Sequence, residues 1–282
     1  MNKGLNGKLN AIVVGLGVLA IAGCGGGGGG GGIQAGNSVF GITPAGSLVR
    51  FEKNNPAIVT TVGAVDGLDG GESLVAIDFR PFTNQLYALS SQSRLYTINT
   101  SNADATPVGA AFTPALVGSV FGMDFNPAAD RLRIVSDAEQ NIRINADTGA
   151  LLTADTNLAF VAGDPNAGNT PDVAALAYTN NTNPPPASAT AYVVDTTRDV
   201  LARLGGVDGT PSPNGGGLTT IGPLGVDATS GLASLDISGN GTALAVMTVG
   251  GTRGLYTVNL TTGAATLVGA LGANVSEIAI TL

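Results

Sequence analysis

Three aspartates recur at one position of a repeated motif. Asp78, Asp124 and Asp236 each follow two or three small or apolar residues and precede Phe or Ile, and two further copies of the motif carry Ala177 and Ala279 at this position. Carboxylates are the groups that glycoside hydrolases use, in pairs about 5–9.5 Å apart, as acid, base or nucleophile. A glycan hydrolase is therefore one hypothesis for these residues.

The repetition itself favours a structural role for the three aspartates. Acid and base catalysis needs chemically different residues, whereas a repeat supplies identical ones. In the structural interpretation the carboxylates accept backbone N–H bonds or pair with Arg80, Arg131 or Arg133. We favour that interpretation and assign no catalytic residue.

A second group of oxygen ligands lies in one loop. Residues 163–172 read Gly-Asp-Pro-Asn-Ala-Gly-Asn-Thr-Pro-Asp and contain Asp164, Asn166, Asn169 and Asp172. Such a loop is a candidate ligand-binding site, with calcium as the candidate cofactor, because Ca²⁺ is bound by six to eight oxygens. The spacing does not match the EF-hand loop, and Asn or Asp next to Gly or Pro is an ordinary turn former. We expect a structured turn, keep the cation as the alternative, and assign no metal site.

Composition excludes most other chemistry. The 282 residues include no His, no Trp and one Cys, with 12 basic and 20 acidic residues and a net charge of −8. Without His there is no Ser-His-Asp triad and no histidine-bound zinc or haem, and one Cys forms no internal disulfide. The negative charge argues against a nucleic-acid partner.

The N-terminal residues are typical of a bacterial lipoprotein. Lys3 and Lys8 precede an apolar run over residues 11–22, which suits a signal peptide and is too short for a membrane span. The segment Leu-Ala-Ile-Ala-Gly-Cys, ending at Cys24, resembles the lipobox, in which the Cys is acylated. We predict a signal peptide over residues 1–23, a lipidated Cys24 and a glycine-rich tether over residues 24–36.

The remaining residues, 37–282, predict a single all-β domain. Short runs rich in Val, Ile, Thr and Tyr alternate with Gly, Asn, Asp and Pro, and the motif that carries the aspartates recurs with three further strands after it. Four short strands per unit of about 40–60 residues are typical of propeller blades. A β-sandwich and an open β-solenoid are the alternatives.

Ring closure is predicted from two incomplete units. Residues 39–65 supply three strands without a first one, and residues 275–280 supply a first strand with nothing after it. Joined, they complete a fifth blade, so we predict a five-bladed β-propeller with four-stranded blades, closed by pairing of the N- and C-terminal segments. In such a ring the first strands line the channel, so Asp78, Asp124 and Asp236 gather near the axis.

At these repeats the sequence also resembles a bacterial family, the domain of unknown function 4394. The most specific segments are residues 122–145, 163–168 and 254–269, and the resemblance covers about residues 37–282. It implies a secreted or lipid-anchored, propeller-like bacterial protein and brings no activity, cofactor or catalytic residue.

From these features we expect a lipid-anchored extracytoplasmic binding or scaffolding module. Its expected partners are the membrane, through the acyl chains on Cys24, and a glycan or protein ligand. A carboxylate-based glycan hydrolase is the alternative, and a structural cell-surface protein is the third hypothesis. Gly25, where some bacteria place an Asp as a retention signal, favours the outer membrane or cell surface over the inner membrane.

Overall fold

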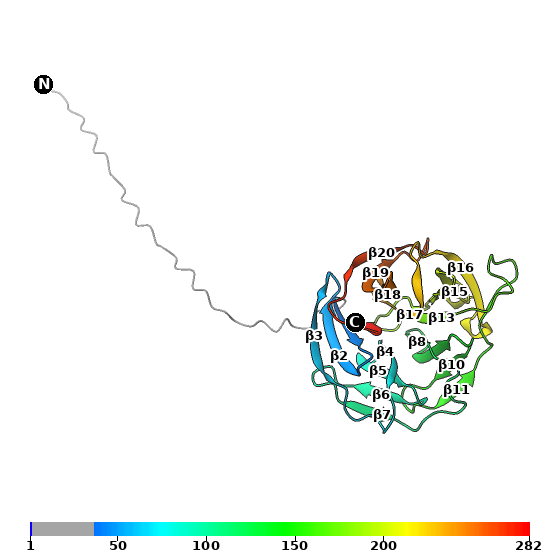
Figure 1. Ribbon diagram of the computed structural model, residues 1–282, viewed down its shortest axis with the longest axis horizontal. Helices are drawn as coiled ribbons and strands as arrows, with labels where there is room; N and C mark the ends of the chain where they lie inside the picture. The colour runs from blue at the N-terminus through cyan, green and yellow to red at the C-terminus, as the bar shows by residue number, and fades with distance from the viewer. Residues whose placement is uncertain (2–36) are drawn as a thin grey trace. The chain divides into compact units, whose positions relative to one another are not determined.

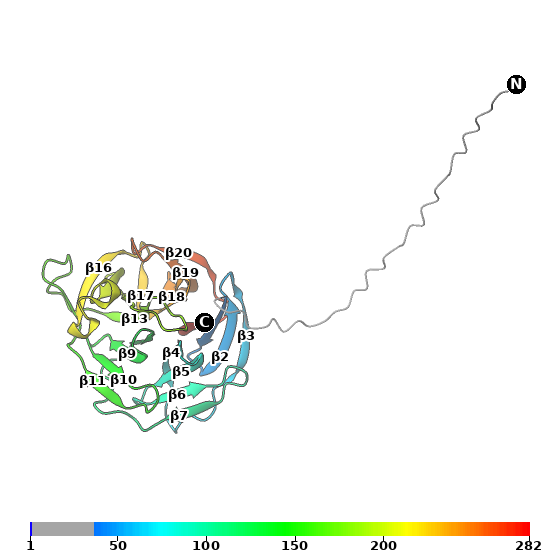
Figure 2. The same cartoon turned by 180° about the vertical axis from the view of Figure 1, so that it is seen from behind.

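The computed structural model describes Met1 and residues 37–282. The predicted signal peptide, Cys24 and the tether lie outside the described residues. Residues 37–282 form a ring of five β-sheets, which Figures 1 and 2 show from its two faces. No helix among the described residues is long and apolar enough to span a membrane; the helical segments there are two short 3₁₀ turns, η1 (Val207–Gly209) and η2 (Pro213–Gly215).

Each sheet is one blade, and its four main strands are antiparallel neighbours from the axis outward. Blade 1 consists of β21 (Glu277–Ile280), β1 (Ser38–Ile42), β2 (Ser47–Glu52) and β3 (Asn55–Ala64). Blade 2 consists of β4 (Leu74–Arg80), β5 (Gln85–Ser90), β6 (Leu95–Ile98) and β7 (Ala105–Val108). Blade 3 consists of β8 (Phe121–Asn126), β9 (Arg131–Ser136), β10 (Asn141–Ile144) and β11 (Leu151–Ala154).

The last two blades differ in strand number. Blade 4 consists of β13 (Val173–Tyr178), β14 (Ala191–Asp195), β15 (Val200–Leu204), β16 (Gly217–Pro223) and β12 (Ala159–Phe160). Blade 5 consists of β17 (Ala228–Ile237), β18 (Ala243–Val249), β19 (Thr252–Val258) and β20 (Ala265–Ala270). The five-bladed propeller predicted from the repeats is confirmed. Blade 4 departs from the expected four strands because the short β12 pairs in parallel with β16 at its outer edge.

The ring closes as the incomplete units predict. β21 pairs with β1 in antiparallel register, with Ala279 opposite Phe40 and Glu277 opposite Ile42. Strands from the two ends of residues 37–282 therefore share blade 1. Because the ring is closed, each first strand has a neighbouring blade on both sides.

Burial follows the distance from the axis. The inner strands β8 and β13 are buried along almost their whole length, because their two faces pack against neighbouring blades, whereas the outer strands β7 and β11 are half-exposed. Aromatic pairs join adjacent blades: Phe40 and Phe79 pack edge to face, as do Tyr87 and Phe125 at 5.2 Å between ring centroids. The inner strands are thereby held as a rigid frame for whatever side chains they bring to the axis.

Candidate functional site

The hub is defined here as the side chains of Asp78 on β4, Asp124 on β8 and Asp236 on β17. A carboxylate oxygen from each lies within 4.8 Å of the other two, and the three residues are 3%, 1% and 4% exposed. Blades 2 and 5 are not neighbours in the ring, so this proximity places the carboxylates together on the axis. The structure thus brings together the three aspartates that the repeat aligns.

Each hub carboxylate contacts the backbone of the next blade in the ring. Asp78 Oδ2 accepts the N–H of Phe125 at 2.9 Å, and Asp236 Oδ2 accepts the N–H of Ile280 at 2.5 Å. The N–H of Tyr178 stabilises the Asp124 carboxylate. Each donor lies one residue beyond the aligned position of its own blade, so the repeat presents the same N–H at three junctions, and at two of them it is hydrogen-bonded to the aspartate. These bonds satisfy N–H groups on the buried inner edges of the first strands.

The junction that follows blade 4 uses a different side chain. Ala177 has no carboxylate to offer, and Asn181, just beyond β13, donates from Nδ2 to the carbonyl of Ile237 at 2.8 Å. Asn181 is itself buried. A polar side chain therefore joins blades 4 and 5 although the aligned aspartate is missing.

Burial and mutual repulsion raise the pKa of the hub carboxyls. Desolvation raises the pKa of Asp78 well above its usual value, and the charge of Asp236 raises it further. Desolvation and the charges of Asp78 and Asp236 do the same for the pKa of Asp124. Burial raises the pKa of Asp236 to about 6, although two backbone N–H groups oppose the shift.

This geometry does not favour glycan hydrolysis. The oxygens are closer together than the roughly 5–9.5 Å at which paired carboxylates flank a scissile bond, and the side chains are buried beneath the surface. The arginines considered as partners have other partners: Arg80 pairs with Asp130 at 2.5 Å, and Arg133 pairs with Asp155 at 3.0 Å. What three convergent carboxylates can do is accept N–H groups, share protons or coordinate a hard cation.

A pocket of about 460 Å³ lies where the first strands of several blades end. The connections after β4, β13 and β17 and the residues after β21 contribute its lining, which consists of Pro81, Asn84, Asn181, Thr182, Asn183, Ser238, Gly239, Asn240, Thr281 and Leu282. None of these ten side chains carries a charge, and seven are amides or hydroxyls.

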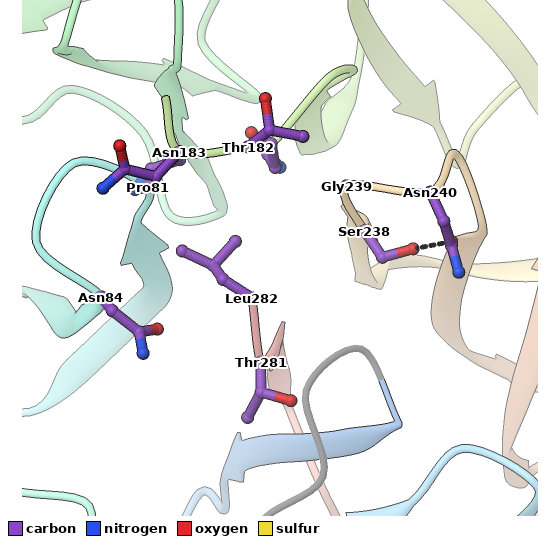
Figure 3. Close-up of a pocket in the computed structure, with 10 residues that line it drawn as sticks. Pro81, Asn84, Thr182, Asn183, Ser238, Gly239, Asn240, Thr281 and Leu282 are labelled. Carbon is purple, nitrogen blue, oxygen red and sulfur yellow. Dashed lines mark hydrogen bonds between the residues drawn. The ribbon is translucent and has the colours of Figure 1, made fainter. Parts of the chain in front are cut away.

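Figure 3 shows how the pocket is arranged. The Leu282 side chain projects into its centre, and Ser238 and Asn240 face it from blade 5. Ser238 Oγ donates to Asn240 Oδ1 at 2.6 Å, which fixes that side of the pocket. A Cβ on Gly239 would lie 2.5 Å from the carbonyl oxygen of Asn181, so the two loops are in close contact and the wall admits no larger residue there.

The loop over residues 163–172 does not gather its oxygens in one place. Asp164 accepts the N–H of Thr220 at 2.6 Å, its hydroxyl at 2.8 Å and the N–H of Asn166 at 2.9 Å. Burial raises the pKa of Asp164, but these donors outweigh it and lower the pKa below its usual value. The Asn166 amide donates to the Thr220 hydroxyl at 3.0 Å.

Asp172 is bound to a different set of groups. Its Oδ2 accepts the hydroxyls of Thr197 at 2.5 Å and Ser230 at 2.9 Å. Asn169 is exposed, and its N–H donates to the carbonyl of Asn166 at 3.1 Å. Within residues 37–282, Asp164 and Asp172 share no hydrogen-bond partner, so the contacts describe an ordered turn.

The comparisons with known proteins agree with this architecture. Residues 47–280 match the model of a family described as a domain of unknown function (DUF4394). The chain belongs to this family. No curated protein matches the chain.

Several solved structures are similar to this member of the DUF4394 family at low sequence identity. A Bacteroides thetaiotaomicron protein of unknown function is 12% identical with a TM-score of 0.51, over 86% of this chain and 63% of that one. PorZ, a surface component of the Porphyromonas gingivalis type-IX secretion system, is 12% identical with a TM-score of 0.42, over 86% of this chain and 28% of that one. Myxococcus xanthus glutaminyl cyclase is 13% identical with a TM-score of 0.46, over 80% of this chain and 83% of that one.

The Bacteroides structure is informative about fold alone. The chain spans less than two thirds of the Bacteroides protein, whose similarity shows a shared propeller-like architecture and nothing about activity.

The pocket is the feature that sequence reasoning missed. Its signal is present in retrospect, because Asn, Thr or Ser follows the first strand of three blades within four residues, as in Asn181, Ser238 and Thr281. In the sequence these residues are typical of turns. Only the closed ring places the turns together at one end of the channel.

Proposed function

We propose that this protein is a non-enzymatic binding module, carried on a lipid anchor outside the cytoplasm, that holds a neutral polyhydroxylated ligand such as a glycan segment. The observation that carries the proposal is the uncharged, amide- and hydroxyl-lined pocket at the channel mouth. A propeller that is displayed on the cell surface and binds such a ligand would hold the ligand there, which is the scaffolding role.

The chemistry of the lining suits saccharide hydroxyls. Amides and hydroxyls both donate and accept hydrogen bonds, as sugar hydroxyls do, and Leu282 and Pro81 offer apolar surface to the face of a sugar ring. The volume of about 460 Å³ falls within the roughly 300–1,000 Å³ of ordinary ligand pockets. None of the lining side chains is charged, so none selects for an ionic ligand.

The binding experiment uses the full-length chain on an array of neutral glycans. Retention without release of shorter products supports the proposal, and turnover would replace it with the hydrolase hypothesis. Absence of retention on every glycan would contradict it and leave the structural cell-surface role.

Variants locate the retention. Asn183 lines the pocket and is exposed, so Asn183→Ala should weaken retention at least several-fold at unchanged melting temperature. Asn169→Ala is the matched control, since Asn169 is also exposed and lies in the 163–172 loop. Equal loss in both variants would show that the glycan binds elsewhere.

The anchor is tested at Cys24. Cys24→Ser removes the thiol that the lipobox resemblance marks for acylation, so the variant should move from the detergent phase to the aqueous phase in a partition assay. Unchanged partitioning, or mass spectrometry of a free Cys24 thiol in the parent, would contradict the anchor and leave the pocket proposal standing.

A further inference from the structure

One hub oxygen has no protein partner. Asp124 Oδ1 is fully buried and accepts no hydrogen bond from any residue that the structure describes, although an unpaired buried acceptor costs about 1–3 kcal/mol. Asp78 and Asp236 each offer an oxygen within 4.8 Å of an oxygen of Asp124. An orphaned, negatively polarised atom therefore lies in a cluster of like groups.

The hub also has no protein counter-charge. Within residues 37–282, the acids paired with Arg80, Arg94, Arg133, Arg143 and Arg198 all lie outside the hub. Buried carboxylates are ordinarily paired, protonated or bound to a metal. Three of them on one axis without an arginine or lysine are electrostatically incomplete.

We propose that Asp78, Asp124 and Asp236 bind a divalent cation of calcium size on the axis of the propeller. All the ligand atoms are carboxylate oxygens, which hard cations prefer over the nitrogen and sulfur ligands of zinc and copper. The unpartnered Oδ1 of Asp124 is the oxygen that the cation would satisfy first.

The ligand set favours calcium over magnesium. A cation equidistant from three oxygens that are at most 4.8 Å apart would lie at most about 2.8 Å from each, so the roughly 2.3–2.6 Å of Ca²⁺–oxygen bonds is within reach. Mg²⁺ usually keeps several waters and binds one or two carboxylates, whereas Ca²⁺ accepts a site built from several protein oxygens. Bidentate carboxylates, water and carbonyls of the inner strands would complete six to eight ligands.

The pocket at the channel mouth lies close to the hub along the first strands. Ser238, in the pocket lining, is two residues beyond Asp236, and Pro81 is three residues beyond Asp78. At about 3.3 Å per residue these intervals correspond to roughly 7–10 Å of strand. The cation site lies below the proposed ligand pocket and uses none of its lining residues, so each can be tested without the other.

The test is calcium binding by the full-length chain after chelator treatment. Calorimetric titration at pH 7.5 should show one saturable Ca²⁺ site. Calcium at about one hundred times its dissociation constant should raise the melting temperature by about 5–10 °C. Absence of saturable binding at millimolar Ca²⁺ would overturn the proposal.

Matched variants place the site. Asp124→Asn removes the charge and the free oxygen, so binding and the melting shift should both disappear. Asp164→Asn combined with Asp172→Asn changes two carboxylates in the 163–172 loop and should retain both. Binding that survives Asp124→Asn and vanishes in the loop variant would overturn the hub assignment.

A measurement on the unmodified chain tests the site without relying on a variant that could fail to fold. Protons compete with the cation at the hub, where the pKa of Asp236 is about 6, so Ca²⁺ affinity should fall at least tenfold between pH 7.5 and pH 5. The titratable groups facing one another there are Asp78, Asp124 and Asp236, with Tyr178 beside Asp124. A loop site containing Asp164, whose pKa is lowered, would keep its affinity, and an unchanged affinity at pH 5 would contradict the hub site.

Discussion

The hub and the 163–172 loop are both acidic, yet the structure treats their carboxylates in opposite ways. In the loop, Asp164 and Asp172 are surrounded by hydroxyl and N–H donors, and the pKa of Asp164 is lowered because those donors outweigh its burial. In the hub, burial and like charges raise the pKa values of Asp78 and Asp124, and Asp124 Oδ1 accepts nothing. The number of acidic residues therefore does not define a site. A site is defined by how many carboxylate oxygens still lack a hydrogen-bond donor from the protein.

The largest effect should follow from removing the strand that the hub holds at ring closure. Deleting residues 275–282 removes β21, including the Ile280 N–H bound by Asp236, and exposes the faces of two neighbouring blades. The single cooperative transition should be lost in chemical denaturation followed by circular dichroism. Deleting residues 166–169 from the loop is the control and should preserve one transition, because the ring does not depend on that loop. A truncated chain that melts like the parent would contradict closure through blade 1.

A smaller but clear difference should separate single carboxylates in the two regions. Asp236→Ala, measured at pH 5 where its carboxyl is largely neutral, leaves the buried N–H groups of Ile237 and Ile280 without acceptors. Each buried donor that loses its partner costs about 1–3 kcal/mol, so the free energy of unfolding should fall by about 2–6 kcal/mol.

Asp172→Ala is the loop counterpart of that variant. Two of its three hydroxyl partners, Thr197 and Ser230, are exposed and can turn to water, and the buried Thr196 hydroxyl is bound only at 3.3 Å, so the loss should be about 1 kcal/mol. Equal losses from Asp236→Ala and Asp172→Ala in urea titrations would remove the distinction between hub and loop.

The smallest difference between hub and loop is in how the free energy of unfolding depends on pH when no metal is bound. A hub carboxyl has a higher pKa folded than unfolded, so the folded chain binds more protons between the two values, and the free energy of unfolding falls as the pH rises through that interval. For Asp236 the interval runs from about 4 to about 6 and is worth on the order of 3 kcal/mol.

Asp164 has the opposite sign. Its lowered pKa contributes stability that is present above pH 4 and is lost as the pH falls further. Urea titrations between pH 2 and pH 8 in chelator should therefore show a maximum near pH 4–5. Stability that instead rises steadily to pH 7 would show that the hub carboxyls are not destabilised when ionised.

The repeat made most of the fold predictable. The aligned motifs around Asp78, Asp124 and Asp236 located three first strands, and the copy around Ala177 located a fourth. The unmatched segments at residues 39–65 and 275–280 predicted the shared blade. β12 was missed because two residues carry no strand periodicity and are held only by their parallel pairing with β16.

The site was predictable only in part. Alignment placed three aspartates in the same layer of the ring, but the distance between residues of non-adjacent blades depends on the inner radius, which no pattern encodes. The free Oδ1 of Asp124 is likewise a matter of which N–H groups the next blade presents. The pocket arises from turns 40 or more residues apart, such as Asn181 and Ser238, that read individually as ordinary connections.

The most direct measurement is a crystal structure of the chain grown with Ca²⁺, with anomalous data collected at long wavelength. We expect one anomalous peak on the propeller axis, within about 2.3–2.6 Å of oxygens of Asp78, Asp124 and Asp236, and none at Asp164 or Asp172. A peak in the 163–172 loop with none at the hub would contradict the view that unsatisfied oxygens, rather than acidic composition, mark the site.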